Sequence, residues 1–174
     1  KHKSGRADVR HIETLCQQHS IPSPRSFCYP GYLHGPTAVR VFREKGYLFA
    51  RRGTLPEIPY AKEGTIGVAY DPKVDHPPLI PSAGNAGPKC GLDELIRAAQ
   101  MAKDGKIAVL TFHGVPDPRA SYVSSNPEDF RKFLDYLRDQ RYKVIALRDL
   151  AEYVDPSKGP ADPYSLNDQG QPFF

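Results

Sequence analysis

One histidine of this chain stands where a side chain could carry acid–base chemistry. His113 follows a nearly continuous apolar run, residues 107–112, and precedes Gly114. Such a run is typical of a buried strand, and in sheets of parallel strands reactive groups gather just beyond the C-terminal ends of the strands. There an imidazole could titrate near neutral pH and donate or accept a proton. The alternative is a histidine that caps a loop through a hydrogen bond.

Other expected strand ends carry polar residues as well. The same criterion selects Tyr29-Pro30-Gly31, Arg51-Arg52, Tyr70-Asp71 and Ser82. The two arginines could clamp an anionic group, or they could be solvated at a strand end. Asp71 and Asp75 could act as an acid–base pair, but this spacing is also typical of a turn in which aspartates accept hydrogen bonds from nearby amides.

The elements that must position these residues follow from hydrophobic periodicity and from glycine and proline signals. We expect helices over residues 7–19, 36–46, 92–102, 128–138 and 149–154, and strands over residues 26–29, 47–50, 67–70, 79–82, 107–112 and 143–146. This alternation predicts parallel strands joined by helical crossovers, in an open doubly wound sheet or in a barrel.

Composition narrows the class of protein. A chain of 174 residues fits one domain. The net charge of +4 is spread along the chain, and the one basic cluster, residues 1–10, lacks interleaved aromatics, so we expect no nucleic-acid partner. No apolar run reaches the roughly 20 residues of a membrane span. The three cysteines form no CxxC pair and leave the redox compartment open.

Four segments in order resemble the C-terminal part of polysaccharide deacetylases with a NodB-type domain. They are S-F-C-Y-P-G-Y, V-F-R-E-K-G-Y-L-F-A-R-R-G, I-A-V-L-T-F-H-G-V and V-I-A-L-R-D-L-A-E-Y-V. The resemblance covers about residues 2–155. It implies an α/β fold over residues 1–154, namely an incomplete, deformed (β/α) barrel that is open where N-terminal strands are missing. Residues 155–174, rich in Pro, Gly, Asp and Asn, are expected to form a surface or disordered tail.

The resemblance also implies an activity: metal-dependent hydrolysis of the N-acetyl amide of an amino-sugar glycan, with a divalent metal, zinc, held by one Asp and two His. His113 matches the histidine that protonates the leaving amine. The amide of Gly31, which follows Tyr29 and Pro30, matches the oxyanion donor. Thr111 shares the strand face of His113 and would line the acetyl pocket.

Several positions depart from the pattern of the family. Its first motif, a T-F-D-D-like stretch with the general base and the metal carboxylate, would lie upstream of Lys1, so we expect the chain to be a fragment. His2 is the candidate for a metal-binding histidine of the second motif. Cys28 stands where the family has an arginine, which Arg51 or Arg52 would have to replace. Asp71 is the nearest match to a carboxylate of the fourth motif, whose tryptophan is absent.

Two other functions stay open at this point. The first is a catalytically inactive relative that only binds carbohydrate, which would explain why Cys28 and Thr111 depart from the family pattern. The second is a hydrolase of the same superfamily that cleaves the amide bond of a small non-sugar molecule. The resemblance implies an extracellular or periplasmic location, and the oligomeric state is open. A fragment of a barrel would leave an unpaired sheet edge and exposed apolar strand faces.

Overall fold

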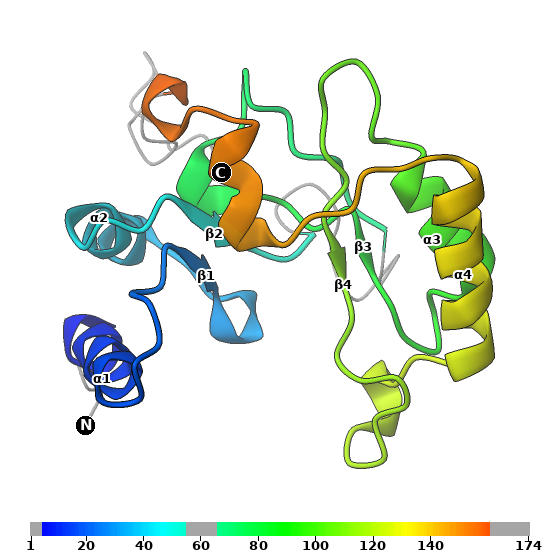
Figure 1. The fold of residues 1–174 in the computed structure, drawn as a ribbon, viewed down its shortest axis with the longest axis horizontal. Helices are drawn as coiled ribbons and strands as arrows, with labels where there is room; N and C mark the ends of the chain where they lie inside the picture. The colour runs from blue at the N-terminus through cyan, green and yellow to red at the C-terminus, as the bar shows by residue number, and fades with distance from the viewer. Residues whose placement is uncertain (1–4, 55–65, 161–174) are drawn as a thin grey trace.

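A computed structural model describes residues 5–54 and 66–160 of the chain (Figure 1). Its helices are α1 (Gly5–Gln18), α2 (Pro36–Glu44), α3 (Leu92–Ala99) and α4 (Pro127–Asp139). Its strands are β1 (Ser26–Cys28), β2 (Phe49–Arg51), β3 (Gly84–Asn85) and β4 (Leu110–Thr111). Short 3₁₀ helices lie at Pro30–Tyr32, Pro77–Leu79, Ser121–Val123, Leu147–Glu152 and Pro156–Lys158.

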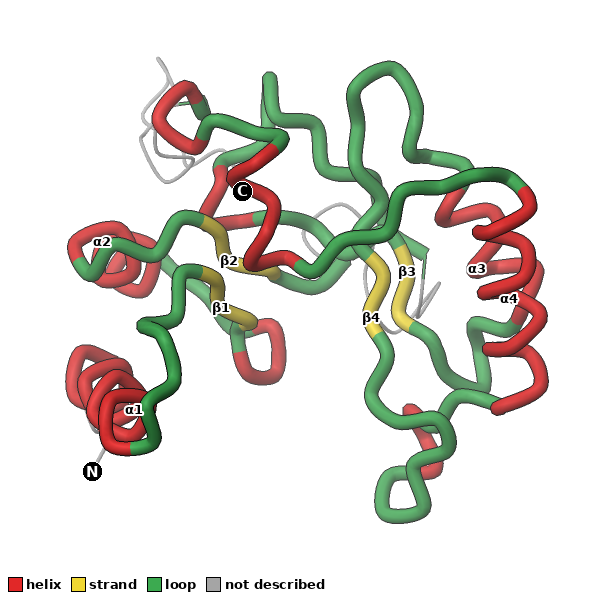
Figure 2. The backbone as a smooth tube through the Cα atoms, viewed as in Figure 1, coloured by secondary structure: helices red, strands yellow, loops and turns green. Residues whose placement is uncertain are grey.

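The short strands are parallel and are joined through the backbone of residues 80–86. β1 pairs with β2, and β3 pairs with β4 (Figure 2). Between the two pairs, the Ile80 N–H donates to the Ala50 carbonyl over 2.9 Å, and the Ala83 N–H donates to the Val109 carbonyl over 2.8 Å. Residues 80–86 therefore run beside β2 first and beside β4 afterwards. The C-terminal ends of all these parallel segments meet at one edge.

Local sequence signals explain where the helices begin and end. Pro36 occupies the first turn of α2, where its missing N–H costs no hydrogen bond. Gly46 follows α2 with a φ of 79°, the left-handed conformation that glycine adopts without steric cost. At the start of α4, the Asn126 side chain accepts hydrogen bonds from the Glu128 and Asp129 amides over 2.8 and 3.1 Å.

Within residues 5–54 and 66–160, buried side chains form three clusters that hold the helices against the strands. The first joins α1 and α2 to β1 and β2, the second lies between α3, α4 and β4, and the third lies around β2 and the 3₁₀ helix Leu147–Glu152. Their aromatic members are Tyr29, Phe42 and Tyr47 in the first, Phe133 in the second, and Phe49 and Tyr70 in the third.

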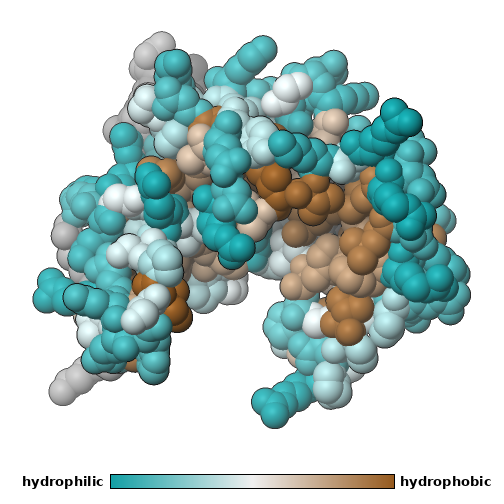
Figure 3. Space-filling view, in the orientation of Figure 1, coloured by the Kyte–Doolittle hydropathy of each residue, from teal (hydrophilic) through white to brown (hydrophobic). Residues whose placement is uncertain are grey.

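Apolar side chains also reach the surface. In Figure 3 they gather along the hollowed part of the visible face, on the side where α4 and β4 lie. Leu134 of α4 and Val144 after it are 47% and 69% exposed. Within the described residues, no helix is both long enough and apolar enough to span a membrane.

The four helices lie where the periodicity predicts them, whereas several expected strands are wrong or much shorter. Residues 143–146 form no strand, because in this structure they find no backbone partner, although Ile145 packs into the third cluster. Residues 67–70 form no strand: Tyr70 makes an antiparallel bridge with Ile107, and the Gly67 N–H donates to the Ala83 carbonyl over 3.0 Å. The expected helix at 149–154 is a 3₁₀ helix that begins at Leu147.

Of the expected tail, residues 155–160 lie within the described part of the chain. They contain the 3₁₀ helix Pro156–Lys158, and a Cβ built on Gly159 would stand 2.5 Å from the Pro77 side chain. The fold is mixed α and β with small parallel sheets. A barrel of the deacetylase type stays a prediction.

Candidate active site at the strand ends

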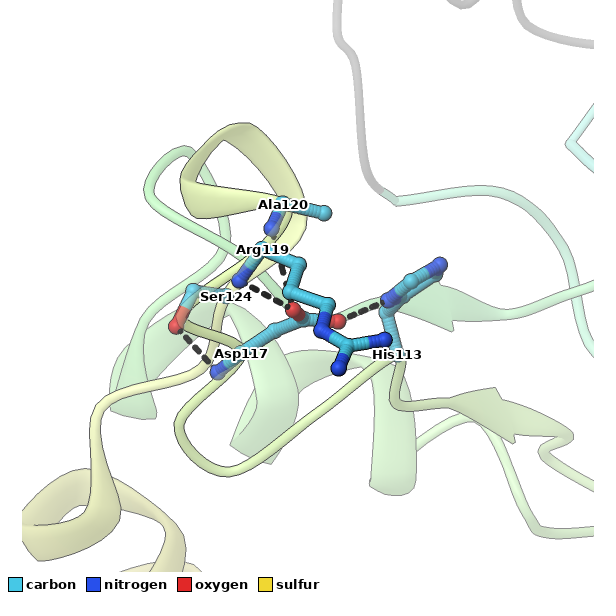
Figure 4. Close-up of polar contacts among 5 residues, drawn as sticks. All are labelled: His113, Asp117, Arg119, Ala120 and Ser124. Atoms are coloured by element: carbon cyan, nitrogen blue, oxygen red, sulfur yellow. Dashed lines mark hydrogen bonds and ion pairs between the residues drawn. The ribbon is translucent and has the colours of Figure 1, made fainter.

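His113 lies two residues beyond β4 and makes a short hydrogen bond through Nδ1 to Oδ2 of Asp117 (Figure 4). The imidazole is 58% exposed, whereas the Asp117 side chain is only 15% exposed. The other oxygen of Asp117, Oδ1, accepts hydrogen bonds from the Arg119 and Ala120 amides, both over 2.9 Å. The carboxylate is therefore fixed by the backbone on one side and presented to the imidazole on the other.

These contacts determine the charge of Asp117 and the tautomer of His113. The hydrogen bond from His113, followed by that from the Arg119 amide, holds the pKa of Asp117 below its ordinary value. Asp117 is therefore ionised at neutral pH. Because an ionised carboxylate only accepts hydrogen bonds, Nδ1 of His113 must carry the proton. Nε2 is then left to exchange a proton with a bound molecule.

The loop that carries Asp117 can fold back because residue 114 has no side chain. A Cβ built on Gly114 would stand 2.7 Å from the Cβ of Asp117. The loop is closed farther on, where the Asp117 N–H donates to Ser124 Oγ over 2.8 Å and the Ser125 N–H donates to the Gly114 carbonyl over 2.9 Å. Residues 113–117 thus form a turn that brings the Asp117 carboxylate into contact with the His113 imidazole.

A row of polar side chains crosses the strand ends beside this pair. Arg51, at the end of β2, donates from Nη1 to Ser82 Oγ over 3.0 Å and from Nη2 to Cys28 Sγ at the end of β1. Ser82 Oγ lies 3.4 Å from Thr111 Oγ1 at the end of β4. Residues from four parallel segments therefore meet in one row, and His113 follows Thr111 by two residues.

The two neighbouring arginines have different environments. The guanidinium of Arg51 lies over the Tyr32 ring, 5.3 Å from its centroid, and this ring packs on Gly53. Arg52 is 1% exposed, and its Nε donates to the Leu79 carbonyl over 3.0 Å. Of the two arginines that the sequence offered, Arg51 is the one whose guanidinium reaches Cys28, the position where the deacetylase pattern has an arginine.

The predicted site segment Tyr29-Pro30-Gly31 follows β1 at the same edge. Tyr29 is buried, and its hydroxyl donates to the Pro78 carbonyl over 2.9 Å. Pro30 and Gly31 form a 3₁₀ turn directly after β1, in which Gly31 has a φ of 58°. Tyr29 therefore anchors this turn, and Gly31 takes a conformation that glycine favours.

Another predicted site residue, Asp71, is not brought to this edge. Asp71 accepts a hydrogen bond from the Lys73 amide over 3.0 Å and lies 3.6 Å from Lys106 Nζ. It follows Tyr70, which pairs with Ile107 at the start of the apolar run, about 20 Å of extended chain before His113. Asp71 therefore lies in a turn, which is the alternative to an acid–base pair that the spacing of Asp71 and Asp75 allowed. His2, the predicted metal ligand, lies outside the described residues.

Asp117 is the residue that sequence analysis missed. The sequence feature that could have revealed it is the spacing: Asp117 follows His113 by four residues, and Gly114 and Pro116 between them allow the chain to reverse. In the part of the chain that the structure describes, no group of three His, Cys, Asp or Glu side chains is placed to hold a metal ion. The described site is therefore a histidine–aspartate pair beside a polar row.

Comparisons with known proteins give no match, neither to a protein-family model, nor to a curated sequence, nor to a solved structure. The likeness to polysaccharide deacetylases thus rests on the four sequence segments.

The contact between His113 and Asp117 predicts a change in titration. In His113→Ala, Asp117 loses its largest stabilising hydrogen bond, so its carboxyl pKa should rise toward the ordinary value. Carboxyl ¹³C NMR measures this directly. Asp155 is the internal control, because Ser157 lowers its pKa independently of His113. An unchanged Asp117 pKa would contradict the contact.

The same geometry fixes how this contact depends on pH. The pKa of Asp117 is lower in the folded protein than in the unfolded chain. Its ionised carboxylate therefore stabilises the fold at any pH above its pKa in the unfolded chain. This stabilisation is lost as the pH falls through its pKa in the folded protein. Protection of the Arg119 and Ala120 amides from exchange should weaken over that acidic range.

The close approach at Gly114 predicts that a methyl group there separates the pair. In Gly114→Ala, Asp117 must move away, so its carboxyl pKa should rise as in His113→Ala. Gly35→Ala is the matched control, since nothing lies within 4 Å of a Cβ at that position. If Gly114→Ala keeps the low pKa of Asp117, the tight turn is not what holds the pair together.

Proposed function

We propose that this chain carries the proton-donating histidine of a hydrolase that removes the N-acetyl group from an amino-sugar glycan. The observation that carries the proposal is the exposed imidazole of His113, oriented by the ionised Asp117 at the ends of the parallel strands. Its likeness to the last motif of polysaccharide deacetylases supplies the reaction. The same likeness implies an extracellular or periplasmic place of action.

Hydrolysis of an amide needs a proton donor at the nitrogen. Water adds to the acetyl carbon, the C–N bond breaks, and acetate leaves the amine. The amine departs only if its nitrogen gains a proton, because an unprotonated amide anion is a very poor leaving group. In the proposal, Nε2–H of protonated His113 gives this proton. Asp117, on the opposite ring nitrogen, stabilises the imidazolium before the transfer.

The polar row would bind the substrate beside this donor. Arg51 presents a guanidinium that could hold a hydroxyl or carbonyl oxygen of the glycan. Thr111 brings a hydroxyl where the family has an apolar residue, so the acetyl pocket would be more polar. The Gly31 amide is the proposed donor to the oxyanion, by analogy with the middle motif.

The zinc ion of the family scheme stays a prediction from resemblance. The residues described here do not form a set of ligands that fits it, so no step is assigned to a metal. The general base is likewise unassigned.

The test is acetate release from N-acetylglucosamine oligomers by the full-length protein with added zinc. His113→Ala should lower the rate by about 10²–10⁴-fold, the usual contribution of a positioned proton donor. His11→Ala, an exposed histidine on α1, is the matched control and should keep the wild-type rate. Equal rates for wild type and His113→Ala would overturn the role of His113.

The same experiment separates the two other functions. A protein that binds the oligomers without releasing acetate would be an inactive carbohydrate-binding relative. Release of acid from small amides, and not from glycans, would indicate the non-sugar hydrolase.

A further inference from the structure

Arg51 carries a positive charge that no carboxylate of the described residues neutralises. Its guanidinium donates to the Ser82 hydroxyl over 3.0 Å, to the Arg52 carbonyl over 3.5 Å and to the sulfur of Cys28. None of these partners is a carboxylate, and none of the ion pairs within residues 5–54 and 66–160 includes Arg51. The end of β2 therefore presents a cation whose counter-ion is missing from the described structure.

The carboxylate described at the same edge does not supply the missing charge. Both oxygens of Asp117 are engaged, one by two backbone amides and the other by His113. Arg51 is half-buried, so its guanidinium has lost part of its hydration without gaining an anion. Burial of an unpaired charge costs free energy, which a bound anion would offset.

The guanidinium is also held in one place. It lies over the Tyr32 ring, 5.3 Å from the centroid, an arrangement that favours a cation and restricts the plane of the group. Tyr32 has a φ of 61°, a left-handed backbone conformation that costs a tyrosine free energy. Its ring packs on Gly53, where a Cβ would stand 2.7 Å from the ring. A strained tyrosine and a glycine thus support the cation from one side.

The donors that remain on Arg51 fit a carboxylate. A guanidinium has five N–H groups, and three of them serve the contacts to Ser82, Arg52 and Cys28. The N–H of Nε and one N–H of Nη2 have no acceptor among the described residues. Two N–H groups match the two oxygens of a planar carboxylate. A phosphate dianion would bring two negative charges to a single guanidinium.

This cation adjoins the proposed proton donor. Ser82 Oγ, which accepts from Arg51, lies 3.4 Å from Thr111 Oγ1. Thr111 and His113 share one face of the extended chain and are about 7 Å apart along it. One bound molecule can therefore contact Arg51 and His113 together.

We infer that Arg51 binds a carboxylate of the substrate, so that the protein prefers an acidic N-acetylated amino sugar to a neutral one. The identity of the sugar rests on the proposed function, whereas the preference for an anion rests on the contacts of Arg51. Cys28, Ser82 and Tyr32 are positioning residues in this assignment, because they hold the guanidinium and leave its remaining donors to the substrate.

Binding can be measured apart from catalysis. The probes are the N-acetylglucosamine tetramer and two acidic counterparts, one with its primary hydroxyls oxidised to carboxylates and one with a carboxymethyl ether on a ring hydroxyl. Each is titrated calorimetrically into the full-length His113→Ala protein, which keeps Arg51 but lacks the proposed proton donor. At least one acidic tetramer should bind about tenfold more tightly than the neutral one, the effect of one charge-assisted hydrogen bond. This advantage should shrink as the NaCl concentration rises.

Substitutions at Arg51 test where the preference arises. In the same background, Arg51→Gln should abolish the acidic preference, while binding of the neutral tetramer shows that the strand ends stay folded. Arg51→Lys keeps the charge but not the planar fork, so it should keep part of the preference even if glutamine disturbs the fold. Arg97→Gln is the matched control, because this exposed arginine lies on α3 and is paired with Glu94.

Equal affinity for the acidic and neutral tetramers, or a full acidic preference in Arg51→Gln, would overturn the inference. Tighter binding of a tetramer sulfated on its primary hydroxyls than of both carboxylates would overturn the assignment to a carboxylate. An acidic preference that depends on Arg51, in a protein that releases no acetate from any tetramer, would keep the anion site and refute the hydrolysis. Acetate release without any acidic preference would do the reverse.

Discussion

Parallel backbone pairing between β2 and residues 80–83 decides where the polar side chains of the candidate site lie. The hydrogen bonds of Ile80 with Ala50 and of Ala83 with Val109 place one segment between two strands that are distant in sequence. Because parallel strands end at the same edge, Cys28, Arg51 and Thr111 come together there with Ser82. Each contributes one polar group, and no single segment could supply the row alone.

His113 extends this edge, and its surroundings decide its chemistry. An exposed imidazole by itself rotates freely and samples both tautomers. Asp117 removes this freedom, because its one oxygen is occupied by two backbone amides and its other oxygen faces Nδ1. The orientation of the ring therefore depends on the turn at Gly114 as much as on the charge of the carboxylate.

Local signals in the sequence predicted the helices and the position of His113, because caps, periodicity and an apolar run act over a few neighbouring residues. The choice between Arg51 and Arg52 needed the structure, since alternate residues of a strand face opposite sides and the sequence does not show which side is covered. Asp71 lies in a local turn, the alternative that its spacing also allowed. Residues 143–146 form no strand because no other segment of the described structure pairs with them, and an apolar pattern does not show whether such a partner exists. Asp117 lay within four residues of His113, but its contact depends on a chain reversal that its residue types allow without requiring.

The central claim is that Asp117 stabilises the imidazolium form from which His113 donates a proton, and the rate of acetate release by Asp117→Asn tests it most directly. The Arg119 and Ala120 amides require an acceptor at position 117, so the asparagine oxygen should face them and turn its NH₂ group toward Nδ1. Nδ1 of His113 would then have to accept this hydrogen bond, so the imidazolium with protons on both ring nitrogens would be disfavoured. We predict a rate at least about 10²-fold below wild type, with the binding of N-acetylglucosamine oligomers unchanged. A wild-type rate in Asp117→Asn would contradict the claim.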